Sequence, residues 1–267
     1  DVSRLLNALL AIGIILQLYQ YYFMAGIYGL NESGFSIRNP GFFLVPSSMA
    51  AYSMATLYFV ARFEPSKKLR LVAFFTTLTS VVLTSSGTGL ISFTLFSFVF
   101  LTGGTKHQTV ALVGAILAGA SSYALLPIIT NREDVYLSPI ARIEVISQAI
   151  DFSKVFYSNT FGAGTNTLIN LNADNLESGQ ALIADSMLGS TLVNLGLTFL
   201  LVIIYELFIR PLHKFNQFGL LYFCAFFPFF ASVITFELFP VNILMFIALS
   251  ELIKTPRLAP KKLLSFA

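Results

Sequence analysis

Charge, cysteine and histidine are all scarce in this sequence of 267 residues. Asp, Glu, Lys and Arg together make up 11% of it, whereas soluble domains contain roughly 25% of these residues. The one cysteine, Cys224, lies in an apolar run. A disulfide within the chain and a thiolate metal site are therefore both excluded.

Long apolar runs take the place of the missing charge. Hydrophobic residues form 56% of the chain and its mean hydropathy is +0.78, and a helix of about 20 apolar residues crosses a bilayer. We predict an all-α polytopic membrane protein in which residues 1–267 form a single integral membrane domain. The eight predicted spans are 5–29, 42–61, 70–85, 89–102, 108–129, 187–209, 217–233 and 239–253.

Two features affect the number of spans. The third and fourth are short and meet at the sequence TSSGTG, Thr84–Gly89, which fits either two full spans or one broken helix lining a cavity. We favour two spans, because the charges fall on consistent sides only with an even number of crossings there. An apolar run begins within five residues of Asp1 without a signal-peptide n-region, so we expect further helices upstream of residue 1.

The basic residues predict the orientation. With the N- and C-termini of this segment in the cytoplasm, twelve of the sixteen Lys and Arg residues lie on the cytoplasmic side, in agreement with the positive-inside rule. These are Arg4, Arg62, Lys67, Lys68, Arg70, Lys106, Arg210, Lys214, Lys254, Arg257, Lys261 and Lys262. The large loop at 130–186 then lies outside the cytoplasm.

This loop contains a predicted amphipathic helix and a glycine-rich turn. Apolar residues recur at steps of three and four within Pro139–Tyr157, which is typical of a helix lying along a membrane surface. Arg142 is at the edge of its apolar stripe, either as an interfacial anchor or directed toward a cavity. The sequence FGAGTN follows, in which Gly162 and Gly164 permit positive φ and expose backbone N–H groups to an anion, although an ordinary turn explains them equally well.

Two further polar pairs precede predicted spans on the outer side. Asp185 and Ser186 stand where a helix N-cap belongs, and a carboxylate there could also act as a general base. Arg38 and Asn39 precede Pro40, where a cap and turn is the alternative explanation. Together these residues place arginines near a glycine-rich turn and a carboxylate, and arginine binds phosphate groups in a bidentate manner.

Four stretches, in this order, resemble the bacterial O-antigen polymerases (Wzy-type) and the related O-antigen ligases. They are SIRNPGFFLVPSSMAAYSMA, LTSSGTGLISF, RIEVISQ with FGAGTN in the large loop, and DSMLGSTLVNLGLTFLLV. The resemblance implies a GT-C-like fold in the bacterial inner membrane and a part in making lipopolysaccharide, capsule or exopolysaccharide. One departure is Ser86-Gly87-Thr88-Gly89 where the family often has Ser-Arg-Gly, so the arginine that the resemblance leads one to expect there is absent.

The resemblance also implies a metal-independent glycosyltransferase without a cofactor. Its substrate would be an undecaprenyl-diphosphate-linked oligosaccharide, its partners membrane lipids, a chain-length regulator and a flippase, and nucleic acid plays no part. Arg142 and Asp185 would be catalytic, with Arg142 and Arg38 matching the arginines that hold the diphosphate. The expected substrate-binding residues are Arg38, Asn39, Gly162, Gly164, Asn166 and Ser186.

The histidines favour a polymerase over a ligase. Ligases typically have a histidine where this chain has Asp185-Ser186, and both His107 and His213 fall in predicted cytoplasmic loops. The alternatives are a ligase-like transferase, a transporter or flippase of lipid-linked glycans, and a non-catalytic subunit of an export complex. A transporter is less favoured, because the spans carry few mid-membrane charges and no repeat is evident.

Overall fold

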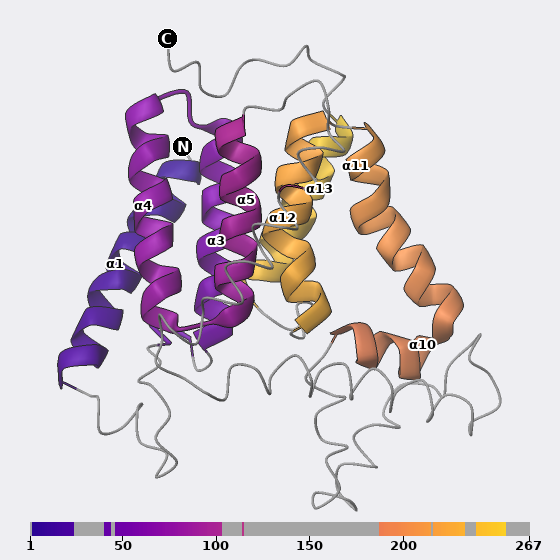
Figure 1. The fold of residues 1–267 in the computed structure, drawn as a ribbon, viewed down its shortest axis with the longest axis horizontal. Helices are drawn as coiled ribbons and strands as arrows, with labels where there is room; N and C mark the ends of the chain where they lie inside the picture. Colours follow the sequence, from indigo (N-terminus) through magenta and orange to yellow (C-terminus); the bar gives the residue numbers. More distant parts are fainter. Residues whose placement is uncertain are drawn as a thin grey trace, which may run out of the picture.

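The computed structural model describes residues 2–23, 40–43, 46–102, 114, 187–214, 216–232 and 239–254, and within these ranges the regular structure is helical. The helices run up and down in one bundle (Figure 1). They are α1 (Val2–Phe23), α3 (Pro46–Phe63), α4 (Lys67–Thr84), α5 (Gly87–Thr102), α10 (Met187–Ile204), the π-helix η2 (Tyr205–Ile209), α11 (Arg210–Lys214), α12 (Asn216–Ser232) and α13 (Val241–Lys254).

These helices overlap seven of the eight predicted spans, of which 24–29, 44–45 and 233 lie outside the described residues. The span 108–129 also lies outside them apart from Gly114. Two of the described segments, Val2–Phe23 and Leu195–Leu212, are long and apolar enough to cross a membrane. The all-helical fold class is therefore confirmed for the described residues. Crossing of the membrane by all eight segments, and the GT-C-like arrangement, stay predictions.

Helix α1 buries a seam of mixed polar and apolar residues and exposes an apolar face. Its buried residues follow one another at alternating steps of three and four, the spacing of a helix that packs along one seam; they are Ser3, Leu6, Leu10, Gly13, Gln17 and Gln20. Its exposed face carries Leu5, Leu9, Ile12 and Ile15. A soluble helix shows the opposite pattern, so this distribution of side chains suits a lipid surround.

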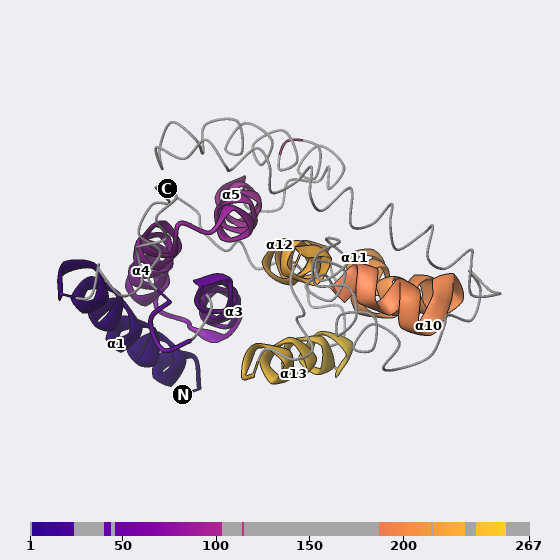
Figure 2. The ribbon, with the colours of Figure 1, turned by 90° about the horizontal axis from the view of Figure 1, so that it is seen from below.

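Helix α3 is the centre of the bundle. Every residue from Ser48 to Ala61 is buried, and α1, α4, α5, α12 and α13 all pack against it (Figure 2). Small side chains make this possible, as is usual where helices approach closely in membranes. At the contact with α5, a Cβ added to Gly89 would lie 2.8 Å from the Cβ of Ala50, so glycine there sets the distance between the two helices.

A serine on α5 compensates for a proline in α12. Pro228 lies inside α12 and has no N–H to donate to the carbonyl of Cys224, four residues earlier. The Ser92 hydroxyl donates to that carbonyl oxygen at 2.7 Å. An unsatisfied carbonyl in an apolar interior costs several kcal/mol, so this contact both joins α5 to α12 and makes the proline tolerable.

Candidate functional site

The two ends of the bundle differ in charge. Within the described helices every Asp, Glu, Lys and Arg belongs to the end at the top of Figure 1, where α1 and α4 begin and α3 and α13 end. The described residues at the lower end carry no charge: the end of α1, the α4–α5 turn, the starts of α3, α10 and α13, and the end of α12. This lower end is the one that the sequence predicts to face away from the cytoplasm.

A glutamine clamps the chain just before α3 to the end of α1. Gln20 Nε2 donates to the carbonyl oxygen of Gly41 at 2.9 Å, and Gly41 N–H donates to Gln20 Oε1, also at 2.9 Å. Gly41 has φ +63°, which L side chains rarely adopt, and the N–H of Phe43 donates to Pro40 O at 3.1 Å to close the turn. Both partners are buried, so Pro40–Phe43 is held firmly against α1.

Toward the bundle centre, buried hydroxyl and amide groups continue from this clamp. Gln17 Nε2 donates to the backbone oxygen of Ser80 at 3.4 Å. The hydroxyls of Ser53 and Ser80 share a hydrogen bond of 2.8 Å, and the Thr77 hydroxyl donates to Ser53 O at 3.4 Å. Side chains from α1, α3 and α4 are thus linked in their common interior, which sequence periodicity within single helices did not reveal.

The TSSGTG sequence forms a tight turn between two antiparallel helices (Figure 1). Ser85 is in the left-handed region with φ 46° and its N–H donates to Val82 O at 3.0 Å, which ends α4. The Ser86 hydroxyl accepts from Gly89 N–H at 3.2 Å and so caps the start of α5. The hydroxyl of Thr88 then meets that of Ser232 at the end of α12, 2.9 Å away.

Helix α10 is broken at Gly196, which has φ 80° and ψ 174°. The segment before the break lies at the lower right of Figure 1, beside the bundle, and the segment after it runs to the opposite end. The sequence predicted one span over 187–209, so the break is a difference from that prediction. Its signal is the glycine in NLGLT, because only glycine adopts this backbone conformation readily.

The eight predicted site residues lie outside the described residues. They are Arg38, Asn39, Arg142, Gly162, Gly164, Asn166, Asp185 and Ser186. Two pairs of them, however, directly precede described residues: Arg38-Asn39 precede Pro40, and Asp185-Ser186 precede Met187. Pro40 and Met187 both belong to the uncharged end, where the clamp, the α4–α5 turn and the first segment of α10 are also found.

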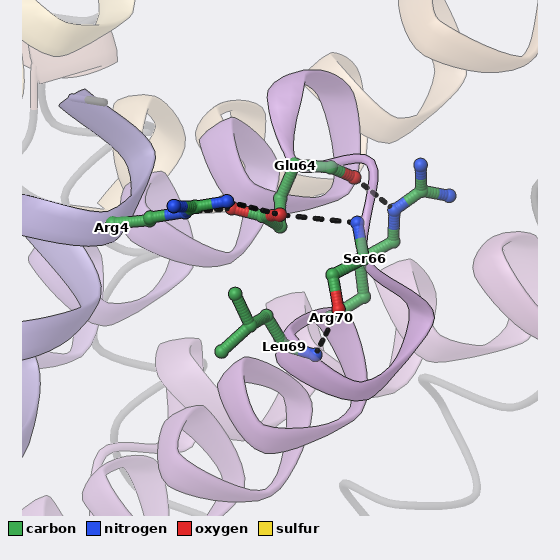
Figure 3. Close-up of polar contacts among 5 residues, drawn as sticks. All are labelled: Arg4, Glu64, Ser66, Leu69 and Arg70. Carbon is green, nitrogen blue, oxygen red and sulfur yellow. Dashed lines mark hydrogen bonds and ion pairs between the residues drawn. The ribbon is translucent and has the colours of Figure 1, made fainter.

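At the charged end, Glu64 connects three chain segments (Figure 3). Arg4 Nε donates to one carboxylate oxygen at 3.0 Å, Ser66 N–H donates to the other at 3.1 Å, and Arg70 Nε donates to the Glu64 backbone oxygen at 2.6 Å. The hydrogen bond from Arg4, followed by that from Ser66, lowers the pKa of the Glu64 carboxyl from its usual value of 4.5. Sequence reasoning placed these residues on one side of the membrane but did not identify their pairing.

Among the described residues, no three His, Cys, Asp or Glu side chains lie close enough together to hold a metal ion. At the uncharged end, the polar groups of the described residues are hydroxyl, amide and backbone groups. A comparison of the chain with protein-family models, curated proteins and solved structures finds no match.

Proposed function

We propose that this chain is the membrane-embedded part of a bacterial polysaccharide polymerase similar to the O-antigen polymerases. It would transfer a glycan from undecaprenyl diphosphate to a lipid-linked repeat unit at the outer face of the inner membrane. The observation that carries this proposal is the common location of three family-like stretches. The described parts of SIRNPGFF, LTSSGTG and DSMLGSTLVNLG all belong to the uncharged end of the bundle.

The proposed reaction breaks the bond between the anomeric carbon of the growing glycan and its diphosphate. A hydroxyl of the acceptor repeat unit forms the new glycosidic bond, its proton is taken up by Asp185 or by water, and undecaprenyl diphosphate leaves. Arg142, assisted by Arg38, neutralises the charge that develops on the leaving diphosphate. Because diphosphate is already a good leaving group, positioning and charge stabilisation matter more than a strong base.

Three features of the described helices support this reaction: the break in α10, the apolar interior of the bundle and the clamp before α3. Non-helical backbone within a membrane protein is tolerated where it is buried in protein or lines a cavity, and α10 breaks at Gly196. The low dielectric constant of an apolar bundle strengthens the attraction between an arginine and a diphosphate. The clamp between Gln20 and Gly41 fixes the chain two residues after Asn39.

The experiment that tests the proposal replaces Arg142 in a strain that lacks its own polymerase. Arg142→Ala should reduce polymer formation roughly a hundredfold, about 3 kcal/mol, because one charge contact to the transition state is lost. Arg142→Lys should recover only part of it, since lysine keeps the charge but cannot bind in a bidentate manner. Lys154→Ala is the matched control, because it removes one positive charge from the same loop.

Long glycan chains persisting in Arg142→Ala at equal expression would remove Arg142 from the mechanism. Purified protein mixed with lipid-linked repeat units then separates the function classes. Chain elongation supports a polymerase. Movement of lipid-linked units across a vesicle membrane without elongation supports a transporter, and the absence of both elongation and movement supports a non-catalytic subunit.

A further inference from the structure

The charged end of the bundle has a strong excess of positive charge that is concentrated in one place. The described helices and their connections contain eight basic residues and three acidic ones. Each acid forms an ion pair: Glu64 with Arg4, Glu206 with Arg210, and Glu251 with Lys254. Four of the basic residues lie within the nine-residue stretch 62–70, which contains a single acid. We call this stretch, the end of α3 and the start of α4, the basic connection.

The basic side chains of this connection are of two kinds. The Arg62 guanidinium lies over the ring of Phe218, 4.2 Å from its centroid, and Arg70 is held by its contact with the backbone of Glu64. Arg70 extends from the connection on the side opposite to Arg4 (Figure 3). Lys67 and Lys68 are exposed. Two arginines in fixed positions therefore stand beside two accessible lysines.

The start of α4 concentrates positive charge. Lys67, Lys68 and Arg70 occupy the first turn of α4, which has no acidic residue, and the helix dipole disfavours cations at a helix start. Their mutual repulsion adds to that cost. The Glu64 carboxylate, which accepts from Ser66 N–H at this helix start, offsets part of the cost, and an anion of external origin would lower it further.

The surroundings of the basic connection indicate which anion it receives. Phe63 is 44% exposed, and Leu71 and Val72 at the start of α4 are also exposed. Cations and apolar side chains are therefore presented side by side at the border between the charged end and the apolar outer surface of the bundle. A lipid with an anionic headgroup meets both kinds of side chain at once, whereas a free anion would leave the apolar ones in water.

We propose that Arg62, Lys67, Lys68 and Arg70 bind the headgroup phosphate of an anionic phospholipid in the adjacent membrane leaflet. The arginines contact phosphate oxygens, the lysines supply additional charge, and Phe63 lies against the acyl chains. This site depends on the chain being embedded in a membrane and not on the proposed glycan transfer. It would tie the α3–α4 connection to the membrane surface.

The test measures lipid binding to the purified full chain in detergent. Cys224 is the only cysteine and is 1% exposed, so a thiol-reactive dye reports unfolding during a temperature ramp. Phosphatidylglycerol should raise the unfolding temperature in a saturable manner, and phosphatidylcholine should not. In Lys67→Gln/Lys68→Gln the half-saturating concentration of phosphatidylglycerol should rise about thirtyfold, given roughly 1 kcal/mol per basic residue at a lipid surface.

The matched control is Arg210→Gln/Lys254→Gln, which changes the net charge of the same end by the same amount outside the basic connection. It should keep the wild-type response within about threefold, because ion-paired exposed residues contribute little. Lys67→Arg/Lys68→Arg should also respond like wild type. Raised ionic strength should weaken the wild-type response, which tests the electrostatic origin without any substitution.

Three outcomes would overturn the proposal. The first is equal stabilisation by phosphatidylcholine, and the second is an equal loss in both glutamine double variants, which would indicate attraction by overall charge. The third is stabilisation by inorganic phosphate at matched ionic strength as large as that by phosphatidylglycerol, which would assign the site to a free anion. The lipid-binding measurement does not involve Arg142, and the polymer measurement on Arg142→Ala does not involve Lys67 or Lys68. Either proposal can therefore fail while the other stands.

Discussion

Gln20 and Gly41, which are twenty-one positions apart, bind each other through both groups of the glutamine amide, with two hydrogen bonds of 2.9 Å. The glutamine thus pairs with a backbone unit as a second peptide group would. This contact joins the end of the first helix to the turn that leads into the central helix. It also fixes the position of Gly41, which lies within the stretch SIRNPGFFLVPSSMAAYSMA that resembles the O-antigen polymerases.

We expect Gln20→Ala to destabilise the fold by about 1–3 kcal/mol, because Gly41 would keep a buried N–H and a buried carbonyl without their present partners. The measurement is the unfolding temperature in detergent from the reaction of Cys224 with a thiol dye. Gln217→Ala is a control of the same residue type and similar burial, because Gln217 makes a single contact of 3.5 Å to Val99 O. A loss in Gln20→Ala no greater than in Gln217→Ala would contradict the role of the clamp.

We expect Ser92→Ala to cost about 1–2 kcal/mol, because the carbonyl of Cys224 would lose the hydroxyl that replaces the N–H missing at Pro228. The decisive measurement is a double-mutant cycle with Pro228→Ala. Alanine restores an N–H four residues after Cys224, so Ser92→Ala should cost less in that background.

A control for this cycle is Ser97→Ala, whose hydroxyl donates at 2.6 Å to Phe93 O within its own helix. Its effect should be the same with proline or alanine at position 228. Equal costs of Ser92→Ala in the two backgrounds would show that the serine does not compensate for the proline.

The stability of the protein should fall in acid through Glu64. Arg4 and then Ser66 lower the pKa of this carboxyl below 4.5 in the folded state. A carboxylate with a lowered pKa stabilises the fold above the unfolded value, and this contribution is lost as the pH falls from about 4.5 through the folded pKa. Unfolding temperatures measured between neutral pH and strongly acidic pH should therefore decrease, and the decrease should be smaller in Glu64→Gln.

The matched control for this pH dependence is Glu251→Gln. Glu251 is 41% exposed and Lys254 Nζ lies 3.7 Å from its carboxylate, so solvent screens this ion pair. The acid dependence of Glu251→Gln should follow the wild type. A wild-type acid dependence that persists in Glu64→Gln would assign the effect to other carboxyl groups.

The positions of the helices could be predicted closely, whereas the contacts between them could not. The predicted span 70–85 corresponds to α4 at Lys67–Thr84, and 239–253 corresponds to α13 at Val241–Lys254. The break at Gly196 was missed, because a glycine within an apolar run is also found in continuous helices. The candidate residues Arg38, Arg142 and Asp185 stay predictions, supported by the resemblance and by their order in the chain.

The sequence by itself determined where helices form, because in an apolar surround each helix must satisfy its own backbone hydrogen bonds and an apolar run of sufficient length leaves no alternative. It also determined that the described charges gather at one end, since burying them within the bundle would be costly. Only the tertiary structure decided that Gln20 binds Gly41, that Ser92 donates to the carbonyl left without a partner by Pro228, and that Arg4 pairs with Glu64. Such pairs depend on which faces of separate helices come together, and helix packing sets that through the shapes and sizes of many side chains at once.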